Sequence, residues 1–163
     1  MCMKILIQEL NMKKIVALTI ACLAAVLLTS PVTRQEQANE AIAVIVHKDN
    51  PMSSLTESEV KLYYLRKIKK RWPGLNKNIR PADRKKPCAE RSAFYVLLGM
   101  DIVQIERYFG NKQLQNAERP PDKFSTETEM INFVAEEVGG IGYIQASSVT
   151  PEIMTKVKVV FTR

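Results

Sequence analysis

The stretch IAVIVHKDNPMSSLTESEVKLYYL, residues 42–65, contains a strand signal, a break and a helix signal in that order. Residues 42–47 are apolar and rich in β-branched side chains, which is typical of a buried strand. Asn50-Pro51 ends that run. Thr56 and Glu59 form a capping box, so we expect a helix to begin here. A buried strand followed directly by a capped helix indicates an α/β domain.

The chain that follows continues this alternation. Residues 79–83 predict a second short strand, which Pro81 places at a sheet edge or near the end of the strand. A helix is expected after Pro87, with Gly99 as its stop. Asp101 then caps a further helix, for which Ile102, Ile105 and Phe109 form the apolar stripe and Gly110 the end. We expect residues 111–124 to form a long loop.

The C-terminal part predicts one more capped helix and two strands. Thr126 and Glu129 form a second capping box, and Gly139-Gly140 ends the helix that they open. Residues 141–144 and 157–161 are short apolar runs and predict strands. The predicted fold is therefore α/β, with a central mixed sheet flanked by helices.

The N-terminal segment has the pattern of an export signal. Residues 15–28 carry no charge and follow Lys13-Lys14, as in a secretory signal peptide. We therefore divide the chain into residues 1–41, a signal peptide or N-terminal anchor with a short linker, and residues 42–163, the folded domain. Cleaved export, an uncleaved anchor and a lipid attachment stay open, and all three predict a periplasmic domain that meets the membrane only through this segment.

The residue inventory of the domain excludes several kinds of site. Cys88 is its only cysteine and His47 its only histidine, so we expect no internal disulfide, no zinc site and no cofactor. The glycines at 139, 140 and 142 follow a helix instead of preceding one, which argues against a nucleotide-binding loop. Neither a catalytic triad nor a nucleophile elbow is present in the sequence, so we do not favour an enzyme.

Positive charge is concentrated in one part of the chain. The whole chain has a net charge of +7, and residues 61–91 contain 12 basic side chains against Asp83 and Glu90, a local net charge of +10. This run predicts a single basic face that attracts anions or an acidic partner. The export signal and the scarcity of interleaved aromatic residues argue against nucleic acid.

Four stretches in order resemble one known family. They are VIVHKDNPMSSLTESEVKLYYL (44–65), RWPGLNKNIRPADR (71–84), ERSAFYVLLG (90–99) and TEMINFVAEEVGGIGYI (128–144). Together they resemble the periplasmic phosphate-binding proteins of ABC importers, which have the type 2 periplasmic binding-protein fold. The resemblance covers residues 42–144 and implies about one lobe of that two-lobed fold.

The resemblance also implies a ligand site. Arg84 matches the anion-binding arginine of the family, and Cys88, Ala89 and Glu90 fall on its Ser-Gly-Thr-like step at a helix N-terminus. Free backbone N–H groups meet the phosphate at such a terminus. Glu90 departs from the pattern because a carboxylate repels an oxyanion, and the Cys88 thiol is a poorer donor than a hydroxyl. The implied ligand is phosphate or another small oxyanion, bound weakly.

Three functions of different classes follow. The first is an extracytoplasmic, non-enzymatic solute-binding protein related to the substrate-binding components of ABC transporters. The alternative is a ligand-free interaction or structural module of the cell envelope, which docks an acidic partner through the basic face. The third is an enzyme that uses Cys88, since a thiol beside Lys86 at a helix start has surroundings that lower its pKa.

Overall fold

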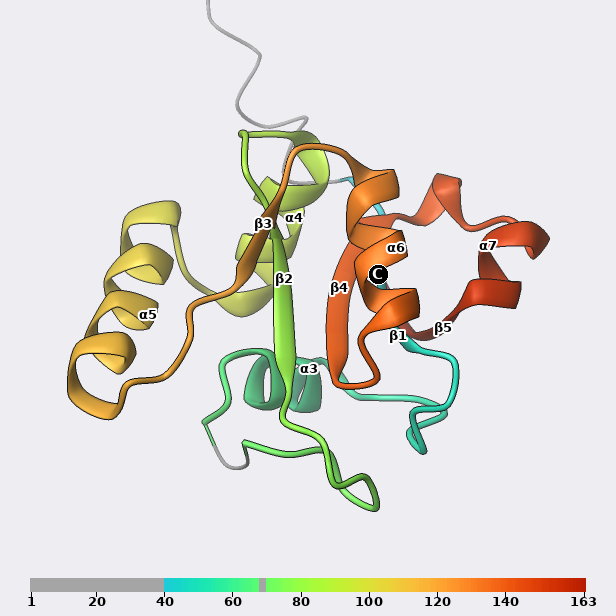
Figure 1. Cartoon of the computed structure of the whole chain (residues 1–163). Coiled ribbons are helices and arrows are strands. Elements are labelled where there is room, and N and C mark those ends of the chain that lie inside the picture. Colours follow the sequence, from blue (N-terminus) through green and yellow to red (C-terminus); the bar gives the residue numbers. More distant parts are fainter. Residues whose placement is uncertain (1–39, 68–69) are drawn as a thin grey trace, which may run out of the picture. The chain divides into compact units, whose positions relative to one another are not determined.

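The computed structural model describes residues 40–67 and 70–163, so the predictions for residues 1–39 lie outside the described part of the chain. Within it, no helix has the length and hydropathy needed to cross a membrane. The described residues contain a mixed sheet in the order β3-β2-β4-β1-β5 (Figure 1). Its strands are β1 (Ile42–His47), β2 (Arg80–Arg84), β3 (Asp122–Phe124), β4 (Gly140–Gln145) and β5 (Val157–Thr162).

The strand directions confirm the predicted mixed sheet. β2 runs parallel to both β3 and β4, whereas β1 is antiparallel to β4 and β5. β2 therefore lies inside the sheet, so the prediction that Pro81 belongs to an edge strand is wrong. The alternative prediction, that Pro81 lies near the end of its strand, is confirmed. Pro81 is the second residue of β2, where it meets Ile141 of β4.

Helices cover both faces of the sheet. They are α3 (Glu57–Tyr64), α4 (Ala89–Leu98), α5 (Ile102–Asn116), α6 (Glu127–Glu136) and α7 (Pro151–Lys156). Along β1, Val44 packs in the same cluster as Phe94 of α4, and Ile45 packs in the cluster of Val134 of α6. Because side chains alternate between the faces of a strand, α4 and α6 lie on opposite faces (Figure 1). This explains why β1 is apolar throughout.

The predicted helix starts are confirmed in detail. Thr56 and Thr126 each accept a hydrogen bond from the backbone N–H three residues ahead, and Glu59 and Glu129 complete the two capping boxes. Gly99 ends α4 with a φ of 69°, a left-handed conformation that glycine adopts without a steric penalty.

The predicted end of α5 is wrong. The helix continues through Gly110 to Asn116, and residues 122–124 of the expected loop form β3. A glycine in a helix interior costs only about 1 kcal/mol relative to alanine, which packing can offset. Here Ile105 and Phe109 are buried and Lys112 Nζ donates to the Arg66 carbonyl at 3.2 Å. The expected stripe is confirmed for these two apolar residues, whereas Ile102 is exposed.

Gly139 has a packing role beyond ending a helix. Trp72, which is buried, donates its indole N–H to the Gly139 carbonyl at 3.0 Å. A Cβ atom on Gly139 would overlap the carbonyl oxygen of Asn78. The segment that leads into β2 therefore packs directly against the turn before β4, and this close backbone approach requires glycine.

Candidate functional site

The carboxyl ends of β2, β3 and β4 meet at one end of the sheet, because these three strands run parallel. Ligands of open α/β sheets characteristically bind outside such strand ends. Both α4 and α6 begin at this end (Figure 1). The backbone N–H of Lys85 donates to the Phe124 carbonyl at 2.7 Å, which holds the loop after β2 against β3.

The structure brings the four predicted site residues together at the start of α4. Arg84 is the last residue of β2, Cys88 is the N-cap of α4, and Ala89 and Glu90 form its first turn. Arg84 Nε lies 3.3 Å from Glu90 Oε1, and these side chains are 14% and 7% exposed. The resemblance therefore selected residues that are true neighbours, although their role as ligands stays a prediction.

Arg84 has unused hydrogen-bonding capacity. Its Nε and Nη1 atoms are buried and find no hydrogen-bond acceptor among the described residues. Glu90 lies within ion-pair distance of Nε without the geometry of a hydrogen bond. Buried donors in native proteins nearly always have an acceptor, so these nitrogens distinguish Arg84 from an ordinary surface arginine.

The N-terminus of α4 also lacks a side-chain cap. Cys88 has extended backbone angles, but its side chain makes no capping hydrogen bond. By contrast, the Thr126 side chain caps α6 by accepting from the backbone N–H of Glu129, and the Glu129 carboxylate accepts from the Thr126 N–H in return. α4 thus begins without the side-chain acceptor that α6 has, which leaves its first backbone N–H groups for an anion.

The surroundings of Cys88 disagree with those of an activated thiol. Burial raises the pKa of the Cys88 thiol, and the Glu90 carboxylate raises it further. The thiolate is the reactive form of cysteine, and a raised pKa reduces its population at neutral pH. The expectation of a lowered pKa from Lys86 and the helix start is therefore wrong.

A buried polar network surrounds Asp83, the residue before Arg84, and the sequence did not predict it. Asp83 is fully buried and accepts hydrogen bonds from Tyr143 Oη at 2.5 Å, Tyr95 Oη at 2.7 Å and Lys123 Nζ at 2.7 Å. The backbone N–H of Arg84 donates to the same carboxylate at 2.8 Å. Asp83 thus fixes the backbone from which the Arg84 side chain extends.

The charge state of Asp83 follows from these contacts. Burial acts to raise its pKa, but the attraction of Lys123 and the hydrogen bonds from Lys123, Tyr143 and Tyr95 outweigh it, and the pKa is lowered. Asp83 is therefore ionised at neutral pH. Burial, together with the charge of the same carboxylate, raises the pKa of Tyr95 and Tyr143, so both phenols stay protonated as donors.

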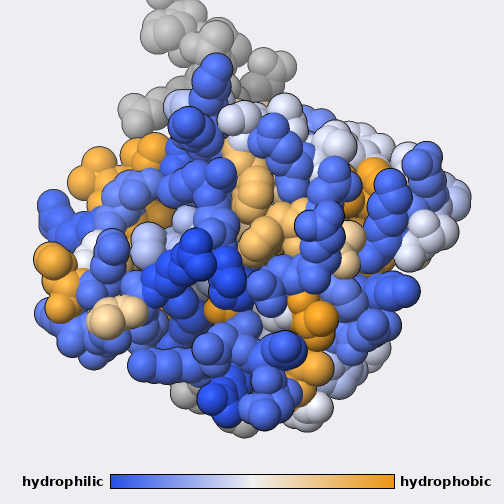
Figure 2. Space-filling view, in the orientation of Figure 1, coloured by the Kyte–Doolittle hydropathy of each residue, from blue (hydrophilic) through white to orange (hydrophobic). Residues whose placement is uncertain are grey.

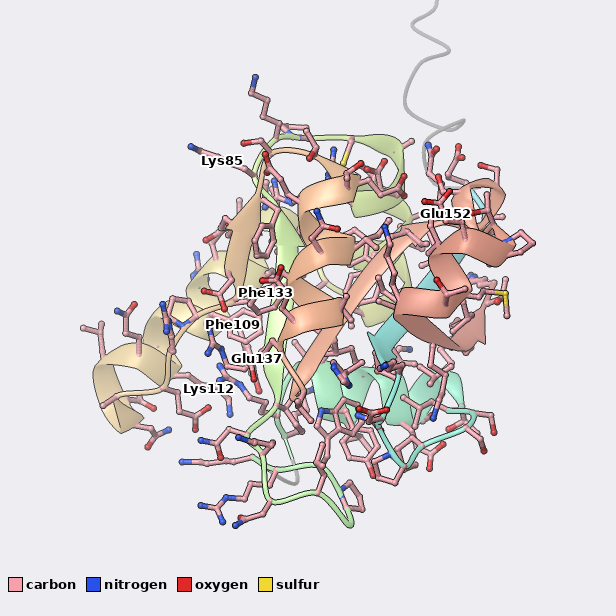
Figure 3. All side chains as sticks on the ribbon, turned by 45° about the vertical axis from the view of Figure 1, so that its right-hand side comes forward. Lys85, Phe109, Lys112, Phe133, Glu137 and Glu152 are labelled. Carbon is pink, nitrogen blue, oxygen red and sulfur yellow. The ribbon has the colours of Figure 1, made fainter. Side chains whose placement is uncertain are left out.

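The prediction of a single basic face is wrong. Lys85 and Lys86 are exposed at the carboxyl end of β2, whereas Lys67, Arg71 and Lys77 are exposed in the segment before its amino end. Figure 3 shows Lys85 at one end of β2 and Glu137 towards the other. The face in Figure 2 is largely hydrophilic and is interrupted by small groups of hydrophobic side chains.

Many of the remaining cations in this run are neutralised. Arg80 pairs with Asp122 at 2.7 Å and with Glu137 at 3.2 Å, and Arg91 pairs with Asp83 at 3.3 Å. The surface that the alternative function assigns to an acidic partner is therefore divided between the two ends of β2. In the described part of the chain, no cluster of histidine, cysteine or carboxylate side chains is arranged to hold a metal ion.

Comparisons with known proteins identify structural relatives only. No protein-family model matches the chain, and no curated protein matches it. A putative phosphate ABC transporter substrate-binding protein from Clostridium perfringens, solved with bound phosphate, is similar with a TM-score of 0.58 and 25% identity. The similarity covers 77% of this chain and 46% of that protein.

Two further solved structures have the same fold. An ABC-type phosphate transport receptor from Vibrio cholerae has a TM-score of 0.57 and 19% identity, over 77% of this chain and 47% of the receptor. PstS from Borrelia burgdorferi has a TM-score of 0.55 and 14% identity, over 74% and 46%. This chain thus matches less than half the length of each relative, and the likeness confirms the α/β fold of a periplasmic binding protein.

Proposed function

We propose that this chain is an extracytoplasmic, non-enzymatic solute-binding protein whose Arg84 site binds phosphate or another small oxyanion. The observation that carries the proposal is the buried Arg84 guanidinium next to the uncapped start of α4, with Nε and Nη1 lacking a hydrogen-bond acceptor among the described residues. The likeness to a substrate-binding protein solved with bound phosphate supports the same reading.

The chemistry of the site favours an anion of modest affinity. A guanidinium and the backbone N–H groups of a helix start both donate hydrogen bonds to oxyanions. Lys85 and Lys86, exposed in the loop between β2 and α4, add positive potential. Glu90 opposes these groups because its carboxylate already neutralises Arg84. We therefore expect phosphate binding that weakens markedly as salt is added.

Export is the second part of the proposal. The uncharged run at residues 15–28 after Lys13-Lys14 supports a periplasmic location, by a cleaved signal peptide or an uncleaved anchor. A C-terminally tagged chain should be found in the periplasmic or membrane fraction of its host. Recovery of the whole chain in the soluble cytoplasmic fraction would contradict this part.

Calorimetric titration with inorganic phosphate at low salt tests the ligand. We expect the full chain to bind phosphate. Arg84→Ala should bind it at least about tenfold more weakly, as for the loss of a charge-assisted hydrogen bond. Arg71→Ala is the matched control, because Arg71 is an exposed arginine before the other end of β2. Absence of binding at millimolar phosphate, or equal affinities for the two variants, would contradict the proposal.

A further inference from the structure

The Arg84–Glu90 pair is isolated from the other charges at this end of the sheet. In the described part of the chain, neither residue is within ion-pair distance of any other charged side chain. The nearby carboxylate Asp83 shows the contrast, since it pairs with both Arg91 and Lys123. Glu90 is also the more deeply buried partner, with 7% of its side chain exposed.

An anion that binds Arg84 must compete with this carboxylate. If the anion displaces Glu90 from the guanidinium, Glu90 remains buried without a cation. Leaving one member of a buried pair without its partner is strongly unfavourable. If Glu90 stays in place, it repels the anion at short range. A ligand that carries negative charge alone is therefore penalised in both arrangements.

A ligand that carries both charges avoids this penalty. Its anionic group takes the place of Glu90 on the guanidinium, and its cationic group takes the place of Arg84 on the carboxylate. Each of the two buried charges then keeps a partner of opposite charge, and the nitrogens of Arg84 that lack acceptors gain them. Because Nε and Oε1 are only 3.3 Å apart, the two charged groups of the ligand must be close together.

We propose that Glu90 is the specificity-determining residue of this site and that the ligand is a small zwitterion, an oxyanion such as a phosphate monoester with an amine a few bonds away. This proposal rests on the proposed function, because it takes Arg84 as the anion ligand. It deepens that function by naming the class of solute. Bare phosphate then binds the native site more weakly than such a zwitterion.

Two probes of similar size test the role of Glu90. Phosphoethanolamine carries an ammonium group, and ethyl phosphate has the same phosphate and ethyl chain without it. We expect the full chain to bind phosphoethanolamine about tenfold more tightly than ethyl phosphate, as for one additional favourable ion pair. Glu90→Gln should abolish this preference, weakening phosphoethanolamine and tightening ethyl phosphate. Glu136→Gln, the same change at an exposed position at the end of α6, should preserve it.

The possible outcomes separate this inference from the proposed function. Equal affinities for the two probes in the unmodified chain overturn the role of Glu90, and this comparison does not depend on the folding of any variant. If Arg84→Ala then abolishes binding of both probes, the proposed function stands alone. If neither probe binds, or if Arg84→Ala changes nothing, both proposals fail.

Discussion

Replacing Asp83 by asparagine should destabilise the fold strongly. The side chain is fully buried, and its Oδ2 atom accepts from Tyr95 and Lys123 and pairs with Arg91 at 3.3 Å. Asparagine removes the charge and can place an NH2 group against these donors. Breaking a buried ion pair costs about 3–5 kcal/mol. Because Glu106 still pairs with Lys123 at 2.8 Å, we expect about 3 kcal/mol.

Urea unfolding followed by the fluorescence of Trp72 measures this loss. Trp72 is the only tryptophan and is buried, so its emission reports on the folded core. Asp49→Asn is the control, because that side chain is 70% exposed and should change the free energy of unfolding by less than about 0.5 kcal/mol. If Asp83→Asn does not fold, Tyr143→Phe removes one hydrogen bond to the carboxylate and should cost about 1–3 kcal/mol.

The pH dependence of stability gives an independent check on Asp83. Its pKa is lowered from the ordinary value of 3.8, so the unfolded chain binds the proton more tightly. The stabilisation is complete above that value and is lost as pH falls through the lower pKa of the folded state. The native chain should therefore lose stability below pH 3.8 more steeply than Asp83→Asn. Equal slopes, or a loss below about 1 kcal/mol at neutral pH, would refute the reasoning.

Four other substitutions test local features of the fold by thermal unfolding. Gly139→Ala forces the backbone away from Asn78 and should cost at least about 2 kcal/mol, and an unchanged melting temperature would contradict the close approach. Gly110→Ala meets nothing within 4 Å inside α5 and should stabilise by about 0.5–1 kcal/mol, whereas destabilisation would argue that the helix ends there. Thr126→Ala removes a cap and should cost about 1 kcal/mol, but Cys88→Ala should cost less, since Cys88 makes no capping bond.

Much of the fold could be predicted because its signals are local. A capping box spans four residues, so Thr56–Glu59 and Thr126–Glu129 each indicate a helix start without any tertiary information. The apolar run at residues 42–47 similarly indicated a strand covered on both faces. The end of α5 could not be predicted in this way. The contact that extends it beyond Gly110 joins Lys112 to the Arg66 carbonyl, 46 residues earlier in the chain.

The same distinction explains what could be predicted of the site. Arg84 and Glu90 are six residues apart, and a strand end followed by a helix start brings such residues together through local geometry. Asp83 instead finds Tyr95, Lys123 and Tyr143 at separations of 12, 40 and 60 residues. Nothing in the spacing of these residues indicates that one carboxylate gathers all three, because their convergence depends on the order of strands in the sheet.

Net charge along the sequence was misleading for a related reason. The length of β2, about 13 Å at 3.3 Å per residue, separates the basic residues that precede it from those that follow it. The carboxylates that neutralise Arg80 and Arg91 come from distant segments, among them Asp122, Glu137 and Glu106. A local count sees the cations and misses these partners. At Arg84 the partner is local, because Glu90 lies six residues further along the chain, so the sequence alone shows both the cation and the carboxylate that neutralises it.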